Sequence, residues 1–413
     1  MPSRLRLEPA ADRPWLSIVG IGEDGLAGLG SDAKRHIAEA EFVFGGKRHL
    51  GLAADLIKGQ SRQWPSPFDA AMRDLMALTG RRVCVLASGD PFLHGVGATI
   101  ARLVPAAEMS VFPAPSAFSL AAARLGWPLA EIETISLHGK AVALLAPLLH
   151  PGRRVLALTS DENGPAAVAA LLAESGFGKS MITVLEALGG GRECIRSARA
   201  DRFAMTAPDP LNVVAIEVEA SHGARILPLT PGIGDDRFEH DGQITKREIR
   251  ALTLSALAPC RGELLWDIGA GAGSVAIEWM LADPSLRAIA IESDPIRAAR
   301  IRRNASALGV PGLAVVEGAA PAACAGLPSP QAIFIGGGGS DDGVLDAAID
   351  ALASGGRLVA NAVTLEMEAI LLDRHARVGG DLARVAVSRV APVGSMHGWR
   401  PALPVTQWSW TKP

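Results

Sequence analysis

Short, largely apolar runs alternate along the chain with segments in which apolar residues recur three and four positions apart. Residues 15–19, 82–87, 154–159 and 288–292 are such runs, and glycine or other turn residues follow each of them. An apolar run of this length bounded by turns is typical of a buried strand, whereas the three-and-four spacing indicates one face of a helix. Strands that alternate with helices predict an α/β architecture.

The most distinctive unit spans residues 263–280, with the sequence ELLWDIGAGAGSVAIEWM. An apolar run ends at Asp267, glycines follow at alternate positions, and apolar residues then recur at helical spacing. This pattern predicts a strand, a glycine turn and the start of a helix. Glycine lets the backbone approach a ligand closely, and the free N–H groups of a helix start favour a nucleotide-like ligand at the end of the strand.

A second signal is Glu292, which ends the next apolar strand 19 residues beyond Gly273. An acid in this position can accept hydrogen bonds from both hydroxyls of a ribose. The spacing GxGxG differs from the dinucleotide fingerprint GxGxxG. Strand, GxGxG, helix, strand and acid together form the pattern of S-adenosylmethionine (SAM) methyltransferases, although a glycine turn alone is about equally often structural.

The chain is long enough for two domains, and one segment suits a boundary between them. Residues 221–236 are rich in glycine and proline and lack periodicity, so we place the boundary near residue 222. We expect one domain over 1–222 and a second over 223–413. In the second, the alternating stretches 384–390 and 404–410 predict a closing strand pair, so this domain matches a doubly wound sheet with an antiparallel ending.

Composition narrows the classes of function. The 413 residues are 49% hydrophobic and 20% charged, which suits folded domains, and the formal charge of −3 argues against a dedicated nucleic-acid binder. Tyrosine is absent, so no tyrosine serves as an acid or base. No apolar run reaches the length of a membrane span, and the first residues show no signal peptide, so we expect a cytoplasmic protein without membrane contact.

The four cysteines, Cys84, Cys194, Cys260 and Cys324, lie far apart in the sequence. This spacing fits no metal knuckle, so we expect no metal site and predict reduced thiols.

Further motifs resemble two known families. The N-terminal half, about 15–220, is similar to the tetrapyrrole methylases, and the C-terminal half, about 231–413, resembles the decarboxylating precorrin methylases. In the first half the matching motifs are 19–22 (VGIG), 88–91 (SGDP), 115–117 (PSA), 136–139 (SLHG), 158–161 (LTSD) and 210–213 (PLNV). In the second half they are 234–238 (GDDRF), 244–248 (ITKRE), 266–271 (WDIGAG), 333–337 (IFIGG) and 361–364 (NAVT). Their order is that of the fused precorrin-6B methyltransferases (decarboxylating).

The resemblance implies a two-lobed αβα domain followed by a Rossmann-like SAM methyltransferase domain. It implies a bifunctional enzyme of cobalamin biosynthesis that methylates precorrin-6B at ring carbons 5 and 15, removes the carboxyl of the ring C acetate and forms precorrin-8. The N-terminal domain would methylate carbon 5, and the C-terminal domain would decarboxylate and methylate carbon 15. A homo-oligomer is also expected.

The resemblance places one SAM site in each domain. Alternatives remain, because Thr245 suits a helix N-cap equally well and SGDP suits an ordinary turn. The expected C-terminal contacts are Thr245, Gly269, Ala270, Gly271, Ala272, Gly273, Glu292, Gly318, Ala319 and Ala320. The expected N-terminal contacts are Gly89, Asp90, Pro91, Ser116 and Ala117.

A macrocycle with many carboxylates requires cationic partners, although each basic residue also suits an ordinary surface charge. Asn361 and Thr364 are the expected catalytic residues, which would position the macrocycle. The family often has a proline where Glu23 and Asp24 stand here, and we expect this acidic pair to face away from an anionic substrate. The candidate substrate-binding residues are Arg247, Arg250, Arg389, His397 and Arg400.

Two other functions remain open at this point. An RNA methyltransferase would share the C-terminal SAM pattern, but it needs a basic surface with aromatic groups for stacking, and aromatic residues make up only 4% of the chain. A partner protein with one inactive domain is the second alternative, although both glycine motifs are kept.

Overall fold

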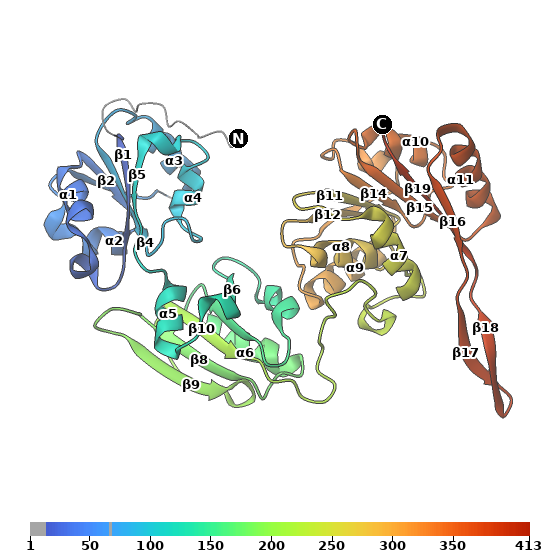
Figure 1. Cartoon of the computed structure of the whole chain (residues 1–413), viewed down its shortest axis with the longest axis horizontal. Coiled ribbons are helices and arrows are strands. Elements are labelled where there is room, and N and C mark those ends of the chain that lie inside the picture. The colour runs from blue at the N-terminus through green and yellow to red at the C-terminus, as the bar shows by residue number, and fades with distance from the viewer. Residues whose placement is uncertain (1–13, 66–67) are drawn as a thin grey trace, which may run out of the picture. The chain divides into compact units, whose positions relative to one another are not determined.

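The computed structural model of the chain describes residues 14–65 and 68–413 (Figure 1). Most of the first residues, for which no signal peptide is predicted, lie outside these ranges. The chain divides into two compact units. The first comprises the chain up to Val142 together with Pro151–Ala224, and the second comprises Ala143–His150 together with Arg225–Pro413.

The first unit begins with a five-stranded sheet in the order β3-β2-β4-β1-β5, in which all neighbours are parallel. Apolar residues alternate between its two faces: Leu16 and Ile18 pack on one side, and Val19 and Ile21 on the other. The strands are β1 (Leu16–Ile21), β2 (Phe42–Gly45), β3 (Gln60–Gln63), β4 (Val83–Ser88) and β5 (Met109–Phe112). The helices are α1 (Ser31–Glu39), α2 (Lys47–Leu52), α3 (Phe68–Met76) and α4 (Val96–Ile100).

A second sheet completes this unit and has the order β6-β7-β10-β8-β9. Its β6–β7 pair is parallel, and its other pairs are antiparallel. The predicted two-lobed α/β fold is thus confirmed. The strands are β6 (Glu133–Ser136), β7 (Arg154–Leu158), β8 (Met181–Glu186), β9 (Cys194–Arg199) and β10 (Asn212–Glu217), with helices α5 (Ala117–Leu125) and α6 (Gly164–Glu174).

The second unit contains a seven-stranded sheet in the order β13-β12-β11-β14-β15-β19-β16. The first five strands are parallel, and β19 pairs antiparallel with both neighbours, which confirms the doubly wound sheet with an antiparallel ending. The strands are β11 (Leu264–Ile268), β12 (Arg287–Glu292), β13 (Ala314–Glu317), β14 (Ala332–Ile335), β15 (Arg357–Ala362), β16 (Asp381–Val385) and β19 (Val405–Thr411). The helices are α7 (Arg247–Leu257), α8 (Ser274–Ala282), α9 (Pro295–Ala307), α10 (Val344–Ala351) and α11 (Leu365–Val378).

Both faces of this sheet are covered by helices. Leu265 packs into the cluster formed with α7, α8 and α9, whereas its neighbour Trp266 packs into the cluster formed with α10 and α11. Burial on both faces explains why β11 begins with three consecutive apolar residues, 264–266, rather than with an alternating pattern. Strand order reverses at β11, because β12 lies on one side and β14 on the other. A ligand crevice is expected at the carboxyl ends of the strands at such a reversal.

The predicted strand over 384–390 is wrong in its extent. The chain forms β16 and then a separate strand, β17 (Ser388–Val393), which pairs with β18 (Met396–Pro401) in a hairpin that extends away from the large sheet (Figure 1). Most hairpin side chains are exposed, including Trp399 at 74%. The alternating stretch 384–390 runs across the point where β16 ends and β17 begins, so its pattern could not separate the two strands.

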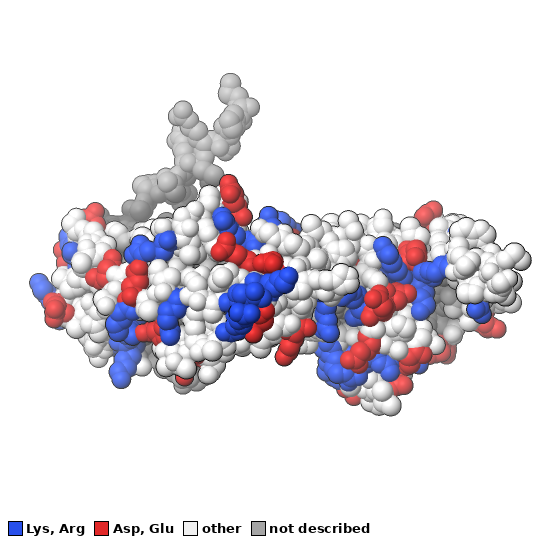
Figure 2. Space-filling view, turned by 90° about the horizontal axis from the view of Figure 1, so that it is seen from below, with Lys and Arg blue, Asp and Glu red and all other residues white. Residues whose placement is uncertain are grey.

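Among the described residues, no helix is long and apolar enough to cross a membrane. Basic and acidic side chains lie interspersed on the face drawn in Figure 2. Mixed signs of this kind agree with the small net charge and provide no extended basic surface on that face.

Candidate functional site

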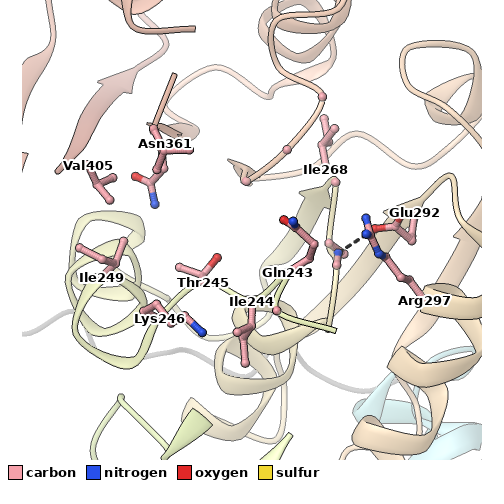
Figure 3. A pocket seen from close by; sticks show the side chains of 18 of the residues that line it. Gln243, Ile244, Thr245, Lys246, Ile249, Ile268, Glu292, Arg297, Asn361 and Val405 are labelled. Carbon is pink, nitrogen blue, oxygen red and sulfur yellow. Dashed lines mark hydrogen bonds between the residues drawn. The ribbon is translucent and has the colours of Figure 1, made fainter. Parts of the chain in front are cut away.

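A cavity of about 530 Å³ lies at the carboxyl ends of the parallel strands of the second unit (Figure 3). Its walls come from the loops after β11, β12, β13 and β14 and from the segment 242–246 that precedes α7. Thr245 and Asn361 lie on one side of it, and Glu292 and Arg297 lie on the other (Figure 3). The lining includes the predicted residues Thr245, Gly269, Ala270, Gly271, Glu292, Gly318, Ala319, Ala320, Asn361 and Arg389.

Glycine is required in the loop after β11 because other backbone comes very close. Gly269 and Gly271 both have left-handed φ angles, of 67° and 58°. A Cβ atom on Gly269 would lie 2.3 Å from the carbonyl oxygen of Gly337, and one on Gly271 would lie 2.9 Å from that of Gln243. The loop is therefore closed in by its neighbours as well as open to a ligand. The predicted contacts Ala272 and Gly273 do not line the cavity; Ala272 is buried and Gly273 is the N-cap residue of α8.

The Glu292 carboxylate is already oriented by backbone groups at the edge of this cavity. Its Oε2 accepts a hydrogen bond from the N–H of Gly271 at 2.7 Å, and its Oε1 accepts one from the N–H of Asp294 at 3.0 Å. The residue is only 5% exposed. A carboxylate has about four lone-pair positions, so two remain for donors on a ligand. This arrangement fits the hydroxyl pair of a nucleoside ribose.

A second acid, Asp267, lies under the glycine loop and is completely buried. Its Oδ2 accepts from the N–H of Ala276 at 3.1 Å, whereas its Oδ1 has no partner among the described residues. Burial, helped by the negative charge of Glu292, raises the pKa of Asp267 to about 7. Asp267 is therefore largely protonated in mildly acidic solution, and it does not line the cavity.

Arg250 was predicted to bind substrate, but its side chain is 0% exposed and does not reach the cavity. Its Nε donates to Glu278 at 2.6 Å, its Nη1 donates to the carbonyl of Thr245 at 2.5 Å and to Asp235, and its Nη2 donates to the carbonyl of Ile233. All its nitrogens are engaged, so we withdraw Arg250 as a substrate contact. Its bond to Thr245 instead supports the segment 242–246 that lines the cavity.

Thr245 lines the cavity and is not the N-cap of α7; that position is held by Lys246, whose side chain makes no capping bond. Arg389 also lines the cavity and forms an ion pair with Glu248. Arg247 is exposed at the start of α7, outside the lining. His397 and Arg400 lie on the hairpin strand β18, also outside it.

The two expected catalytic residues have different surroundings. Asn361 lines the cavity, and its amide is held by a polar network: its Nδ2 donates to Thr253 Oγ1 at 3.0 Å, and its Oδ1 accepts from Gln407 at 2.9 Å. Thr364 instead caps α11, since its hydroxyl accepts from the N–H of Met367 at 3.3 Å. Thr364 does not line the cavity, so only Asn361 has the placement expected of a group that positions substrate.

Sequence reasoning missed several residues of the cavity wall. Arg297, which pairs with Asp241 at 2.9 Å, and Lys246 belong to no glycine motif. Val363 and Leu403 add exposed apolar groups, 58% and 74% exposed. The glycine run 336–338 could have been identified as part of the cavity wall from the sequence, because consecutive glycines after a strand indicate that the backbone approaches another group closely.

The first unit has its own cavity, of about 970 Å³. The loops after β1 and β4 contribute to it, together with residues of the second sheet and the start of α5. Ser116 caps α5 by accepting from the N–H of Ser119 at 3.0 Å, and the Gly89 carbonyl accepts from the N–H of Ala114, which joins the two predicted loops. Of the predicted contacts, Gly89, Asp90, Ser116 and Ala117 line this cavity, whereas the buried Pro91 does not.

Glu23 faces this cavity, contrary to the expectation that the acidic pair would point away. It is paired with Arg48 and, at 3.4 Å, with Arg192, so its charge is compensated. Arg48 also donates to Ser88 Oγ at 2.6 Å, and His49 Nε2 lies 2.8 Å from the same hydroxyl. Burial, helped by the charge of Arg48, lowers the pKa of His49 to about 4, so this imidazole is neutral at neutral pH.

Among the described residues, no group of three or more His, Cys, Asp or Glu side chains is placed to hold a metal ion.

Comparisons with known proteins match each half of the chain separately. The model of the tetrapyrrole (corrin/porphyrin) methylases matches residues 16–202, and that of the precorrin methyltransferase domain matches residues 236–412. A protein of Sinorhizobium sp named precorrin-6Y C(5,15)-methyltransferase (decarboxylating) is 63% identical over 98% of this chain and 98% of its own length. A protein of the same name from Mycobacterium tuberculosis is 42% identical over 96% of this chain and 99% of its own.

Among solved structures, the C-terminal domain of precorrin-6Y C5,15-methyltransferase from Rhodobacter capsulatus is 50% identical to the aligned part of this chain. The match covers 45% of this chain and 100% of that domain, with a TM-score of 0.43.

Proposed function

The chain belongs to the family of precorrin-6Y C(5,15)-methyltransferases (decarboxylating), and from this premise we propose that it uses SAM to methylate precorrin-6B at ring carbons 5 and 15. It also removes the carboxyl of the ring C acetate, so that precorrin-8 forms on the route to cobalamin. The observation that carries the proposal is the Glu292 carboxylate, bonded to the glycine loop at the edge of a cavity in the half that matches precorrin methyltransferases. Nothing in these matches supports an RNA methyltransferase.

We assign one SAM site to each unit, because each unit has its own cavity lined by a predicted glycine loop. SAM supplies an electrophilic methyl group when bound. In the second unit Glu292 would hold the ribose, Gly269 and Gly271 would approach the amino-acid part, and 318–320 would lie near the adenine. In the first unit Gly89, Asp90, Ser116 and Ala117 would hold the nucleotide.

The residues of the chain serve mainly to position the reactants, since methyl transfer requires close alignment of donor and acceptor. Asn361 is oriented by Thr253 and Gln407, so its second amide hydrogen is available to orient the macrocycle. Arg389 is the basic residue from the predicted substrate set that lines the cavity, and a substrate carboxylate would compete with Glu248 for it.

The two chemical steps are assigned to the two domains expected from the sequence. We propose that residues 1–222 methylate carbon 5 and that residues 223–413 decarboxylate and methylate carbon 15. Self-association and a cytoplasmic location stay predictions.

The test follows product formation from precorrin-6B with SAM carrying a ¹³C-labelled methyl group. Mass spectrometry should show two added methyl groups and the loss of carbon dioxide, and NMR should place the labels on two ring carbons. Glu292→Gln should raise the KM for SAM in carbon-15 methylation about tenfold or more, because charge-assisted hydrogen bonds are lost. Glu317→Gln is the matched control, because Glu317 is the register partner of Glu292 on β13 and is exposed outside the cavity.

A wild-type protein that adds no methyl group would overturn the proposed function. An equal effect of Glu292→Gln and Glu317→Gln would overturn the assignment of the ribose-binding acid.

A further inference from the structure

Four charged side chains line the cavity of the first unit, and they differ in whether other groups of the chain pair with them. Glu23 and Arg48 form an ion pair. Asp90 accepts from the N–H of Phe92 at 2.9 Å, within its own turn. Lys140 is exposed and, within the described part of the chain, forms no ion pair or side-chain hydrogen bond. An unpaired cation in a concave site attracts an anionic ligand.

The turn that carries Lys140 is fixed by its own hydrogen bonds. The Lys140 N–H donates to the carbonyl of Leu137 at 2.9 Å, and the Gly139 N–H donates to Ser160 Oγ at 2.8 Å. The Ser160 hydroxyl in turn donates to the Leu137 carbonyl. The backbone that carries Lys140 after β6 is therefore ordered before a ligand binds, so binding does not have to order it.

His94 reaches the same cavity from the other lobe, in the loop after β4. Its φ of 57° lies in the left-handed region, which non-glycine residues rarely occupy. Its ring meets Phe118 edge-on at 6.1 Å between centroids. Burial and the charge of Lys140 lower the pKa of His94, and a neutral imidazole ring presents one N–H donor.

We propose that Lys140 and His94 form a carboxylate-binding site in the cavity of the first unit. The inference rests on the proposed function, since both reactants of that function carry carboxylates: the side chains of the macrocycle and the amino-acid part of SAM. Lys140 and His94 donate hydrogen bonds from the two lobes, so a carboxylate between them links the lobes through one ligand. Arg48 is less suited to this role, because Glu23, Ser88 and His49 already engage it.

The experiment measures binding to the full chain without turnover. Calorimetric titrations use two probes: S-adenosylhomocysteine, which keeps the amino-acid carboxylate, and a stable porphyrin with carboxylate side chains. Lys140→Met should weaken one binding event about tenfold or more, as expected for loss of a hydrogen bond to a charged group. Lys140→Arg should retain most of the affinity, and His94→Phe should weaken the same event.

Lys179→Met is the matched control, because Lys179 is an exposed lysine of the same unit outside the cavity. A weaker S-adenosylhomocysteine event identifies the amino-acid carboxylate as the ligand, and a weaker porphyrin event identifies a macrocycle side chain. If Lys140→Met binds both probes as Lys179→Met does, the carboxylate site is refuted. The proposed function is judged separately, by whether the wild-type enzyme adds the carbon-5 methyl group.

Discussion

Replacement of Arg250 by methionine tests how the second unit holds the segment that lines its cavity. Methionine has a similar length and no charge, so Arg250→Met removes the guanidinium with a limited change in volume. The variant loses the bonds to Glu278, to Asp235 and to the carbonyls of Ile233 and Thr245. The face of Phe238, whose ring centre lies 4.8 Å from the guanidinium carbon, also loses its cation.

The size of the effect follows from burial. The Glu278 side chain is 3% exposed, and after the substitution its partners among the described residues are the N–H groups of Gly232 and Ile233. A buried charge that loses its counter-ion typically costs about 3–5 kcal/mol of folding free energy. Adding Glu278→Gln removes the stranded charge, so the double variant should be less destabilised than Arg250→Met alone.

Hydrogen exchange of the full chain, read on peptides from α7 and α8, measures the free energy of local opening. Methylation assays measure the KM for SAM at carbon 15. Arg250→Met should lower the opening free energy and raise this KM, because Thr245 loses a support. Arg247→Met, on the exposed start of the same helix, should change the opening free energy by no more than the ±0.5 kcal/mol typical of surface sites and should leave the KM for SAM unchanged. An Arg250→Met protein that matches Arg247→Met would refute the reasoning, and so would a double variant less stable than Arg250→Met.

Two further predictions concern the same unit. Because the pKa of Asp267 is raised from 3.8 to about 7 in the folded state, wild-type stability should fall as the pH rises from about 4 to 7. The free energy of unfolding of Asp267→Asn should therefore rise relative to that of the wild type over this range, and the difference should become constant above pH 7, at up to roughly 4 kcal/mol. Urea unfolding at pH 5 and pH 8 measures this difference, which should be larger at pH 8. An equal difference at both pH values would contradict the prediction. Asn361→Ala should lower kcat for carbon-15 methylation about tenfold. Gln407→Met, which removes a hydrogen-bond partner of Asn361 that lies outside the cavity, should lower kcat less. Equal losses of kcat would assign Asn361 a purely structural role.

The sequence was most informative where site residues follow one another closely along strands. Gly269, Gly271 and Glu292 lie at the ends of two adjacent parallel strands, so their spacing alone predicts that they meet. The doubly wound order was predicted for the same reason, since each strand carries an apolar run that both faces of a sheet require.

Residues whose surroundings come from distant segments could not be placed in this way. Arg250 resembles any basic residue on a helix, and its burial depends on Glu278 and on carbonyls of the preceding segment. Thr364 was expected to position the macrocycle, yet its hydroxyl caps the N-terminus of α11. Glu23 was expected to avoid the cavity because of its charge, and a pattern of single residues cannot reveal compensation by Arg48 and Arg192.

The hydrogen bonds of Glu292 also determine which nucleotides the second unit rejects. An ionised carboxylate only accepts hydrogen bonds, and two of its positions are already occupied by N–H groups of Gly271 and Asp294. A ligand that presents two hydroxyls completes the set, whereas a ribose that bears a 2′-phosphate would bring a second negative charge against a nearly buried first one. The site should therefore discriminate against phosphorylated dinucleotides by electrostatic repulsion, and a 2′-deoxy analogue should bind weakly because it leaves one acceptor without a donor.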